Sequence, residues 1–293
     1  MNDDMHKKNE VDPHTGVETT GHEWDGIKEL NTPTPRWWLW VLYVTIIWSV
    51  GYWIVYPAWP TFSGHTEGTF GWTQHKQLAQ SQAEIVERQA QYLDRFRSMS
   101  FEQIMADEEI YAFAIAGGSS AFKDNCATCH GTGGAGSKGY PNLNDDDWLW
   151  GGSVKEIHDT IRHGVRSIHD ETLYSQMPAF GKDELLNREE IVALVDHVVS
   201  LSDTSAEKSA KGSELFATNC ASCHGDKGQG LTEFGAPDLS DQIWLYGGSR
   251  KDIFESIYNS RFGVMPTWEG RLDDDTVRQL SIYVHSLGGG EQE

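Results

Sequence analysis

The sequence is poor in basic residues and in cysteine. Its 293 residues include 23 Lys and Arg but 44 Asp and Glu, so the formal net charge is −21 at pH 7. A chain with this charge repels nucleic acids and steers basic proteins toward its surface. It contains only four cysteines. All four lie in two copies of one short pattern. The function of every thiol in the chain therefore depends on what this pattern does.

The pattern is Cys-x-x-Cys-His, at residues 126–130 and 220–224. Residues at i, i+3 and i+4 lie on one face of a helical turn and can hold a flat macrocycle from one side. Two thiols followed directly by an iron-ligating histidine are typical of c-type haem attachment, whereas a zinc site needs four converging ligands and a redox disulfide needs no histidine. We therefore predict two covalent haem c groups. Their attachment sites would be Cys126, Cys129, Cys220 and Cys223, and their iron ligands would include His130 and His224.

Two of the six methionines, Met177 and Met265, lie forty-odd residues beyond the predicted haem-binding histidines, and each directly precedes a proline. A thioether opposite an imidazole is the ligand pair of cytochromes c, and the proline fixes the loop backbone. Taking each methionine with the motif before it, we predict His130 and Met177 for the first iron and His224 and Met265 for the second. The alternative is that each methionine only fills a gap in the core.

The similarity between the two halves extends well beyond these ligands. Residues 148–153 correspond to residues 244–249, and apolar residues recur at helical spacing near the end of each half. We predict an all-α fold with two tandem domains, each similar to a class I cytochrome c, at residues 109–203 and 204–293. Domains this short bury little surface by themselves, so the haem would supply much of each core.

One long apolar run interrupts the polar N-terminal part of the chain. Residues 37–56 carry no charge, and a helix of this length spans the roughly 30 Å hydrocarbon layer of a membrane. Trp and Tyr gather at both of its ends, as at a membrane interface. A cleavable signal peptide is the alternative, but no small-x-small cleavage site follows the run. We predict a flexible tail at 1–31, a transmembrane anchor at 32–60 and an amphipathic linker helix at 61–108.

The resemblance of each half to class I cytochromes c implies one further pair of residues. In that family a proline carbonyl, in a loop about a dozen residues after the haem-ligating histidine, accepts a hydrogen bond from the imidazole. Pro141 and Pro237 match this position. Such a partner fixes the orientation of the ring and raises its basicity as a ligand.

The chain as a whole resembles the dihaem subunit of cbb3-type cytochrome c oxidase. The likeness rests on Asn31–Trp40, Gly51–Trp53, Tyr56–Pro60 and Gly68–Trp72, followed by the two haem domains. It implies that a soluble cytochrome c or a cytochrome bc complex donates electrons to this chain. The electrons would then pass through a monohaem cytochrome c subunit to a catalytic haem–copper subunit, in a reaction coupled to proton pumping.

The resemblance also implies where the protein works and what it does not do. Haem attachment to this motif takes place outside the bacterial inner membrane, so we expect periplasmic haem domains behind a single-pass anchor, with the N-terminus in the cytoplasm. The chain itself would not reduce oxygen. The alternatives are a free membrane-tethered electron shuttle that serves another reductase or dehydrogenase, and a haem-based sensor with an open iron site.

Overall fold

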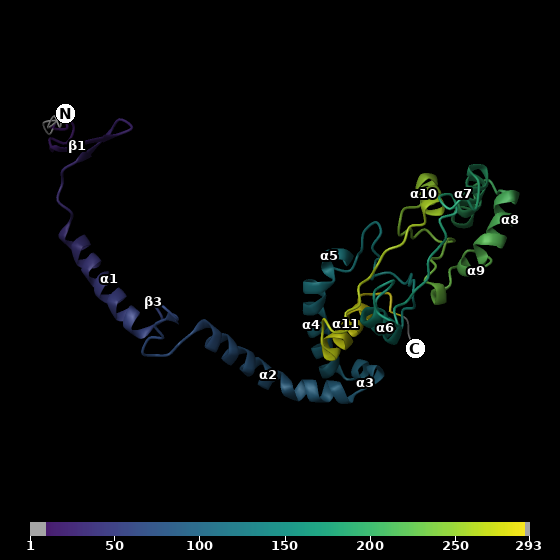
Figure 1. Ribbon diagram of the computed structural model, residues 1–293, viewed down its shortest axis with the longest axis horizontal. Helices are drawn as coiled ribbons and strands as arrows, with labels where there is room; N and C mark the ends of the chain where they lie inside the picture. Colours follow the sequence, from purple (N-terminus) through teal and green to yellow (C-terminus); the bar gives the residue numbers. More distant parts are fainter. Residues whose placement is uncertain (1–9, 291–293) are drawn as a thin grey trace. The chain divides into compact units, whose positions relative to one another are not determined.

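The computed structural model describes residues 10–290, so the first nine residues of the predicted tail lie outside the described part. The chain divides into two compact units, one ending at Arg88 and one beginning at Gln89, which are described separately. The described residues are mostly helical and include two short antiparallel hairpins (Figure 1). The predicted all-α class, with one apolar helix near the N-terminus, is confirmed.

The first unit contains a hairpin that the sequence analysis did not predict. Strand β1 (Thr19–Trp24) pairs antiparallel with β2 (Ile27–Leu30). Asp25 and Gly26 form the turn, with φ angles of 48° and 86°. This left-handed backbone is the one that an Asp-Gly pair favours in a two-residue hairpin loop. The predicted flexible tail over residues 1–31 therefore contains a hairpin over residues 19–30.

Helix α1 (Arg36–Val55) covers the uncharged run. By length and composition it is a candidate to span a membrane, and none of these twenty residues is buried. The two-residue strands β3 (Pro60–Thr61) and β4 (Gly64–His65) pair beyond it. Helix α2 (Gln74–Ser98) follows, and its C-terminal turns belong to the second unit.

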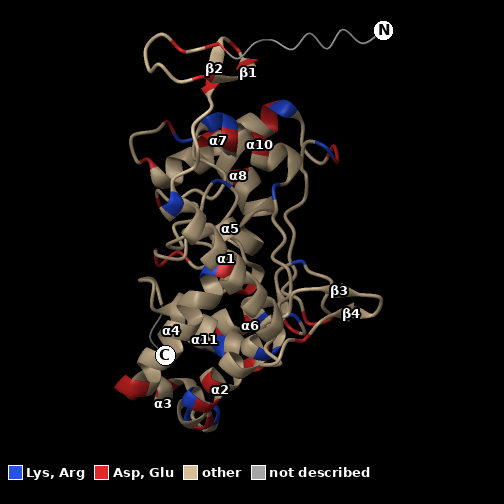
Figure 2. Ribbon diagram, turned by 90° about the vertical axis from the view of Figure 1, so that its left-hand side faces the viewer, with Lys and Arg blue, Asp and Glu red and all other residues tan. Residues whose placement is uncertain are grey.

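The helices of the second unit form two bundles. Both views show α4, α6 and α11 together at one end of this unit and α7, α8 and α10 at the other (Figures 1 and 2). The elements are α3 (Phe101–Ala106), α4 (Glu108–Asn125), α5 (Ala127–His130), α6 (Val154–His163), α7 (Arg188–Ser202), α8 (Ala210–Asn219), α9 (Ala221–His224), the 3-10 helix η1 (Thr232–Phe234), α10 (Arg250–Asn259) and α11 (Asp274–His285).

The first bundle is built from α4, α5, α6 and α11. Phe122 of α4, Ile161 of α6 and Leu280 of α11 are buried in one cluster. The end of α2 covers this bundle. Phe96 is completely buried there, and the Arg278 guanidinium lies 4.7 Å from the centre of its ring. These contacts join the start of the second unit to its last helix.

The second bundle is built from α7, α8, α9 and α10. Leu194 of α7, Phe216 of α8 and Ile257 of α10 are buried together in its core. These helices follow one another along the chain, so this bundle is one continuous segment. That segment is inserted between α6 and α11, the third and fourth helices of the first bundle.

The contacts between helices cross the predicted domain boundaries. The prediction assigned residues 109–203 to one domain and 204–293 to the next, but each bundle takes helices from both halves of the sequence. Helix α7 ends the first half and packs on α8, while α11 ends the second half and packs on α4. The two halves carry equivalent contact residues, and the terminal helix of one half therefore fits against the first helix of the other.

Each of these helix pairs approaches closely at a glycine. A Cβ atom added at Gly118 of α4 would lie 2.3 Å from the Gln279 carbonyl oxygen of α11. One added at Gly212 of α8 would lie 2.0 Å from the Ala193 carbonyl oxygen of α7. Any side chain at either position would force the two helices apart.

Replacing Gly212 with Ala is expected to lower the free energy of unfolding by about 1–3 kcal/mol, the usual cost of overpacking a tight contact. Gly133 is a matched control, because a Cβ there has no atom within 4 Å. Gly133→Ala is expected to change stability by less than about 0.5 kcal/mol. Urea denaturation of the purified protein measures both. Equal effects would show that the α7–α8 contact is looser than described.

Candidate haem-binding sites

Each Cys-x-x-Cys-His motif forms a single helical turn directly after a longer helix. Helix α5 follows α4 and helix α9 follows α8. Cys126 and Cys220 are the residues that join the paired helices, and His130 and His224 end the short ones. The two thiols and the imidazole of a motif therefore belong to one turn, as the spacing predicts.

The two histidines have the same hydrogen-bond partner. His130 Nδ1 lies 3.1 Å from the Pro141 carbonyl oxygen, and His224 Nδ1 lies 3.0 Å from that of Pro237. A carbonyl can only accept, so Nδ1 carries the proton and Nε2 keeps a free lone pair. Burial lowers the pKa of both histidines, although the carbonyl bond opposes this effect. Both rings are therefore neutral at pH 7, which is the form that ligates iron.

A pocket in the second bundle brings the second motif together with Met177. Its lining includes Met177, Cys220, Cys223 and His224. Most of the remaining wall is apolar and includes Phe180, Leu194, Val198, Phe216, Ile253 and Ile257. Ser260 Oγ donates a hydrogen bond of 2.5 Å to the Met177 carbonyl, a contact that no local sequence pattern indicated.

Met265 lies in the core of the first bundle. It is partly buried and packs against the cluster that includes Ile161, against which Cys126 and Trp148 also pack. Its backbone is fixed by Val165, because each residue donates its N–H to the carbonyl of the other at 3.0 Å. Met265 therefore enters the first bundle on a returning segment. This segment pairs with Val165, at the point where the chain leaves the same bundle.

The structure does not support the predicted assignment of each methionine to the motif before it. It places Met177 with His224, and it places Met265 in the bundle that holds His130. The reason is the connectivity: after α6 the chain crosses to the second bundle, so the first methionine arrives there. The chain returns to the first bundle only after α10, and this returning segment contains Met265.

The residues in both bundles fit a haem c. Each bundle offers two thiols on one turn, a neutral imidazole with a fixed tautomer, and a thioether within apolar surroundings. Burial raises the pKa of the Cys126 and Cys220 thiols to about 11, so both are protonated at neutral pH before any covalent attachment. A haem bound here would supply an iron that alternates between the ferrous and ferric states.

Acidic loops from the two halves meet beside these sites. Asp145 and Asp147 line a cavity that also includes both Pro141 and Pro237, the partners of the two histidines. Burial, followed by the nearby charges of Asp241, Asp145, Asp238 and Asp146, raises the pKa of Asp147 to about 6. This carboxyl is therefore protonated far more readily than an ordinary aspartate.

Asp147 is expected to make the stability depend on pH. The folded chain keeps this proton between about pH 4 and 6, where the unfolded chain has lost it, so the free energy of unfolding falls as pH rises through this window. Asp147→Asn should remove that fall and stabilise the protein at pH 7 by about 1 kcal/mol, after a discount for solvent screening. Thermal unfolding at several pH values measures this. Asp124→Asn, at an exposed position of α4 whose charge is not among those that raise the pKa of Asp147, is the control and should keep the original pH profile.

One-turn haem motifs, carbonyl-bonded imidazoles and apolar pockets with a thioether define the protein as a c-type cytochrome. Two family models match the chain. The N-terminal domain of cytochrome oxidase-cbb3, FixP, matches residues 16–63, and cytochrome c oxidase, cbb3-type, subunit III, matches residues 113–198 and 207–284. The chain belongs to the FixP/CcoP family of cbb3-type cytochrome c oxidase subunits.

Full-length relatives agree with this assignment. The chain is 50% identical to the cbb3-type cytochrome c oxidase subunit FixP of Bradyrhizobium sp. (strain ORS 278), over 98% of this chain and all of the relative. It is 49% identical to FixP of Rhizobium meliloti (strain 1021), over 98% and 99% of the two chains. The predicted resemblance is confirmed, and the protein is a membrane-anchored, haem c-containing subunit in the electron-transfer path of the oxidase.

Proposed function

We propose that this subunit carries two haem c groups and relays electrons from a donor cytochrome toward the oxygen-reducing centre of the oxidase. The observation that carries the proposal is the occurrence of two equivalent donor sets, one in each bundle. Both Pro141 and Pro237 line the cavity between the motif loops, so the two sites are close neighbours within one folded unit.

The proposed ligands follow the bundles and not the order of the sequence. The first haem would be attached at Cys126 and Cys129, and His130 and Met265 would be its iron ligands. The second would be attached at Cys220 and Cys223, and His224 and Met177 would be its iron ligands. A thioether opposite an imidazole gives a higher potential than two nitrogen ligands do.

The protein's part in electron transfer is to hold both irons in a fixed environment. The Pro141 and Pro237 carbonyls keep the imidazoles oriented and polarised. Met177 and Met265 would supply the thioether ligands of the two irons, which would keep small ligands such as oxygen from binding there. Apolar walls exclude water, so little has to rearrange when an electron arrives or leaves. None of these steps requires proton transfer by a side chain of this chain.

The experiment that tests the proposed function is purification of the native complex from solubilised membranes. The chain should co-purify with haem b, copper and oxygen-consuming activity, together with a catalytic haem–copper subunit and a monohaem cytochrome c subunit. It should contain two haem c per chain. A chain that purifies alone, without copper, would instead be a membrane-tethered electron shuttle.

The acidic charge of the chain favours a basic soluble cytochrome c as the donor, and a cytochrome bc complex is the other candidate. If attraction between opposite charges speeds their encounter, the second-order rate of electron transfer should fall at least tenfold when ionic strength rises from about 0.01 to 0.15 M. Stopped-flow mixing with a basic cytochrome c measures this rate. A flat salt response would assign the charge to solubility alone.

For the localisation, we propose a single pass through the bacterial inner membrane by α1, with the N-terminus in the cytoplasm and both bundles in the periplasm. The support is that covalent haem attachment to this motif occurs outside that membrane. Protease added to intact spheroplasts should remove both haem-bearing bundles. Full protection of the haem-staining band would reverse the proposed orientation.

A further inference from the structure

The loop between α6 and Met177 is longer than its counterpart in the second half. Sixteen positions separate Ile161 from Met177, but eight separate Ile257 from Met265. The loop is closed on itself by Thr172, whose Oγ1 donates to the Gly164 carbonyl at 3.1 Å. Val165, near its start, pairs with the backbone of Met265. The extra residues therefore border the segment that brings Met265 into the first bundle.

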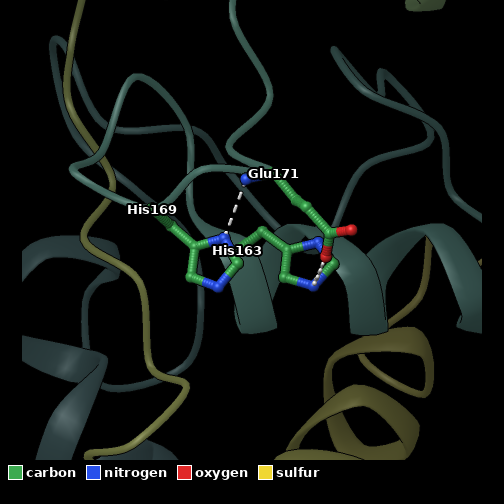
Figure 3. Close-up of side chains that lie close together, drawn as sticks. All are labelled: His163, His169 and Glu171. Carbon is green, nitrogen blue, oxygen red and sulfur yellow. Dashed lines mark hydrogen bonds and ion pairs between the residues drawn. The ribbon is translucent and has the colours of Figure 1, made fainter.

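His169 lies within these extra residues and has both ring nitrogens bonded. The Glu171 backbone N–H donates to His169 Nδ1 at 3.0 Å. Since Nδ1 accepts, Nε2 carries the proton and donates it to a Glu269 carboxylate oxygen at 2.6 Å. The His169 ring lies beside that of His163, with 4.8 Å between centroids, and the Glu171 carboxylate is 3.4 Å from His163 Nε2 (Figure 3).

His163, His169 and Glu171 are residue types that bind transition metals, and their ligand atoms lie within 4.8 Å of one another. The hydrogen bonds argue against that use. A metal ion at His169 would have to displace either the Glu171 N–H or the Glu269 carboxylate, and both contacts are short. The contacts of His169 instead form a hydrogen-bonded tie, which joins the loop after α6 to the segment that contains Glu269.

Glu269 is the residue that this tie holds, and it lies four positions after Met265. Its other carboxylate oxygen accepts from Arg162 Nε at 3.0 Å and from Arg162 Nη2 at 2.5 Å. Its backbone N–H donates to the Arg162 carbonyl at 3.1 Å, and Thr267 Oγ1 donates to the same carbonyl at 2.6 Å. The segment from Met265 to Glu269 is thus fastened to the end of α6 along its length.

We propose that His169 and Glu269 are positioning residues that hold this returning segment so that the Met265 sulfur stays on the iron of the first haem. The inference rests on the proposed ligation of that iron by Met265. Met265 lies on a segment that returns from the second bundle, so its position depends on the hydrogen bonds that hold this segment. If the segment were mobile, the thioether could leave the iron. Partners of this kind commonly change metal–ligand affinity by about 10–100-fold.

Carbon monoxide binding to the reduced holoprotein tests the proposal, because the gas reaches the iron only when the methionine is displaced. Wild-type protein should bind it slowly or not at all. Met265→Ala should open half of the total haem. His169→Ala should raise the rate of binding at that same half by about 10-fold. His169→Gln keeps an N–H donor where Nε2 lies and should restore most of the slow binding.

His158→Ala is the matched control. His158 lies on α6 and is partly buried, as His169 is in the loop. Its ring contacts Phe101 and Asp159 and makes no contact with Glu269 that would hold the Met265 segment. Unchanged binding in His169→Ala, with half of the haem opened in Met265→Ala, would overturn the positioning role and keep the ligand assignment. Closed haem in Met265→Ala would overturn both. Stoichiometric binding of Zn²⁺ by wild type that His169→Ala abolishes would replace the tie with a metal site.

Discussion

A fragment of residues 173–261, exported to the periplasm, is expected to carry one covalent haem ligated by His224 and Met177. The fragment comprises the whole second bundle, and the residues buried in its core, such as Leu194 and Phe216, all lie within it. The purified fragment should show the absorption of a low-spin haem c, and it should resist carbon monoxide when reduced.

A second fragment, residues 1–203, corresponds to the predicted first half of the chain. It is expected to form no His/Met haem although it contains both the first motif and Met177. It lacks α11, whose Val277, Leu280, Ile282 and Val284 are buried. Burying each such side chain contributes about 1.5–3 kcal/mol, so their loss is comparable with the total stability of a domain, about 5–15 kcal/mol. A folded 1–203 fragment that resists carbon monoxide would contradict the exchanged connectivity and restore two sequential domains.

Replacing Met265 with His is expected to lower the potential of the first haem by on the order of 100 mV, because axial ligands set haem potentials over a range of about 0.8 V. Two nitrogen ligands stabilise the ferric state more than an imidazole and a thioether do. The haem attached at Cys220 and Cys223 should keep its potential. A redox titration followed by absorption measures both values in the full-length protein.

The isolated second bundle identifies which haem has changed. Its single potential and spectrum should match the component that Met265→His leaves untouched in the full-length chain. Met177→His is the reciprocal variant and should shift only that component. If Met265→His lowered the potential of the component matching residues 173–261, each methionine would ligate the haem of its own half, as the order of the sequence suggested.

The local geometry of the candidate sites could be predicted from the sequence because it is encoded locally. The thiols and the imidazole of a motif share one helical turn, and Pro141 and Pro237 follow their histidines at nearly the same distance. Each of these contacts depends on a few adjacent residues. The predicted proline contacts accordingly have the expected partners in both bundles.

The bundle to which each methionine belongs could not be predicted from the sequence. It depends on whether the terminal helix of each half packs on the first helix of its own half or on that of the other half. Gly118 and Gly212 occupy the same place in the two halves, and each accepts a terminal helix at close range. The pattern of apolar residues specifies that a first helix packs on a terminal helix. It does not specify from which half that terminal helix comes. The short connection between Ser202 and Ala210, which joins α7 to α8 directly, is a local indication that these two helices pack together.

The inserted position of the second bundle sets an order of events during biosynthesis. A chain made from its N-terminus presents Cys126–His130 long before Met265, and the intervening residues already suffice for the second bundle. Under the proposed ligation, the residues that would hold the first haem are therefore complete only after those of the second bundle have been made. A chain that ends before Met265 would, under the same ligation, lack the thioether ligand of its first haem while keeping everything needed for its second.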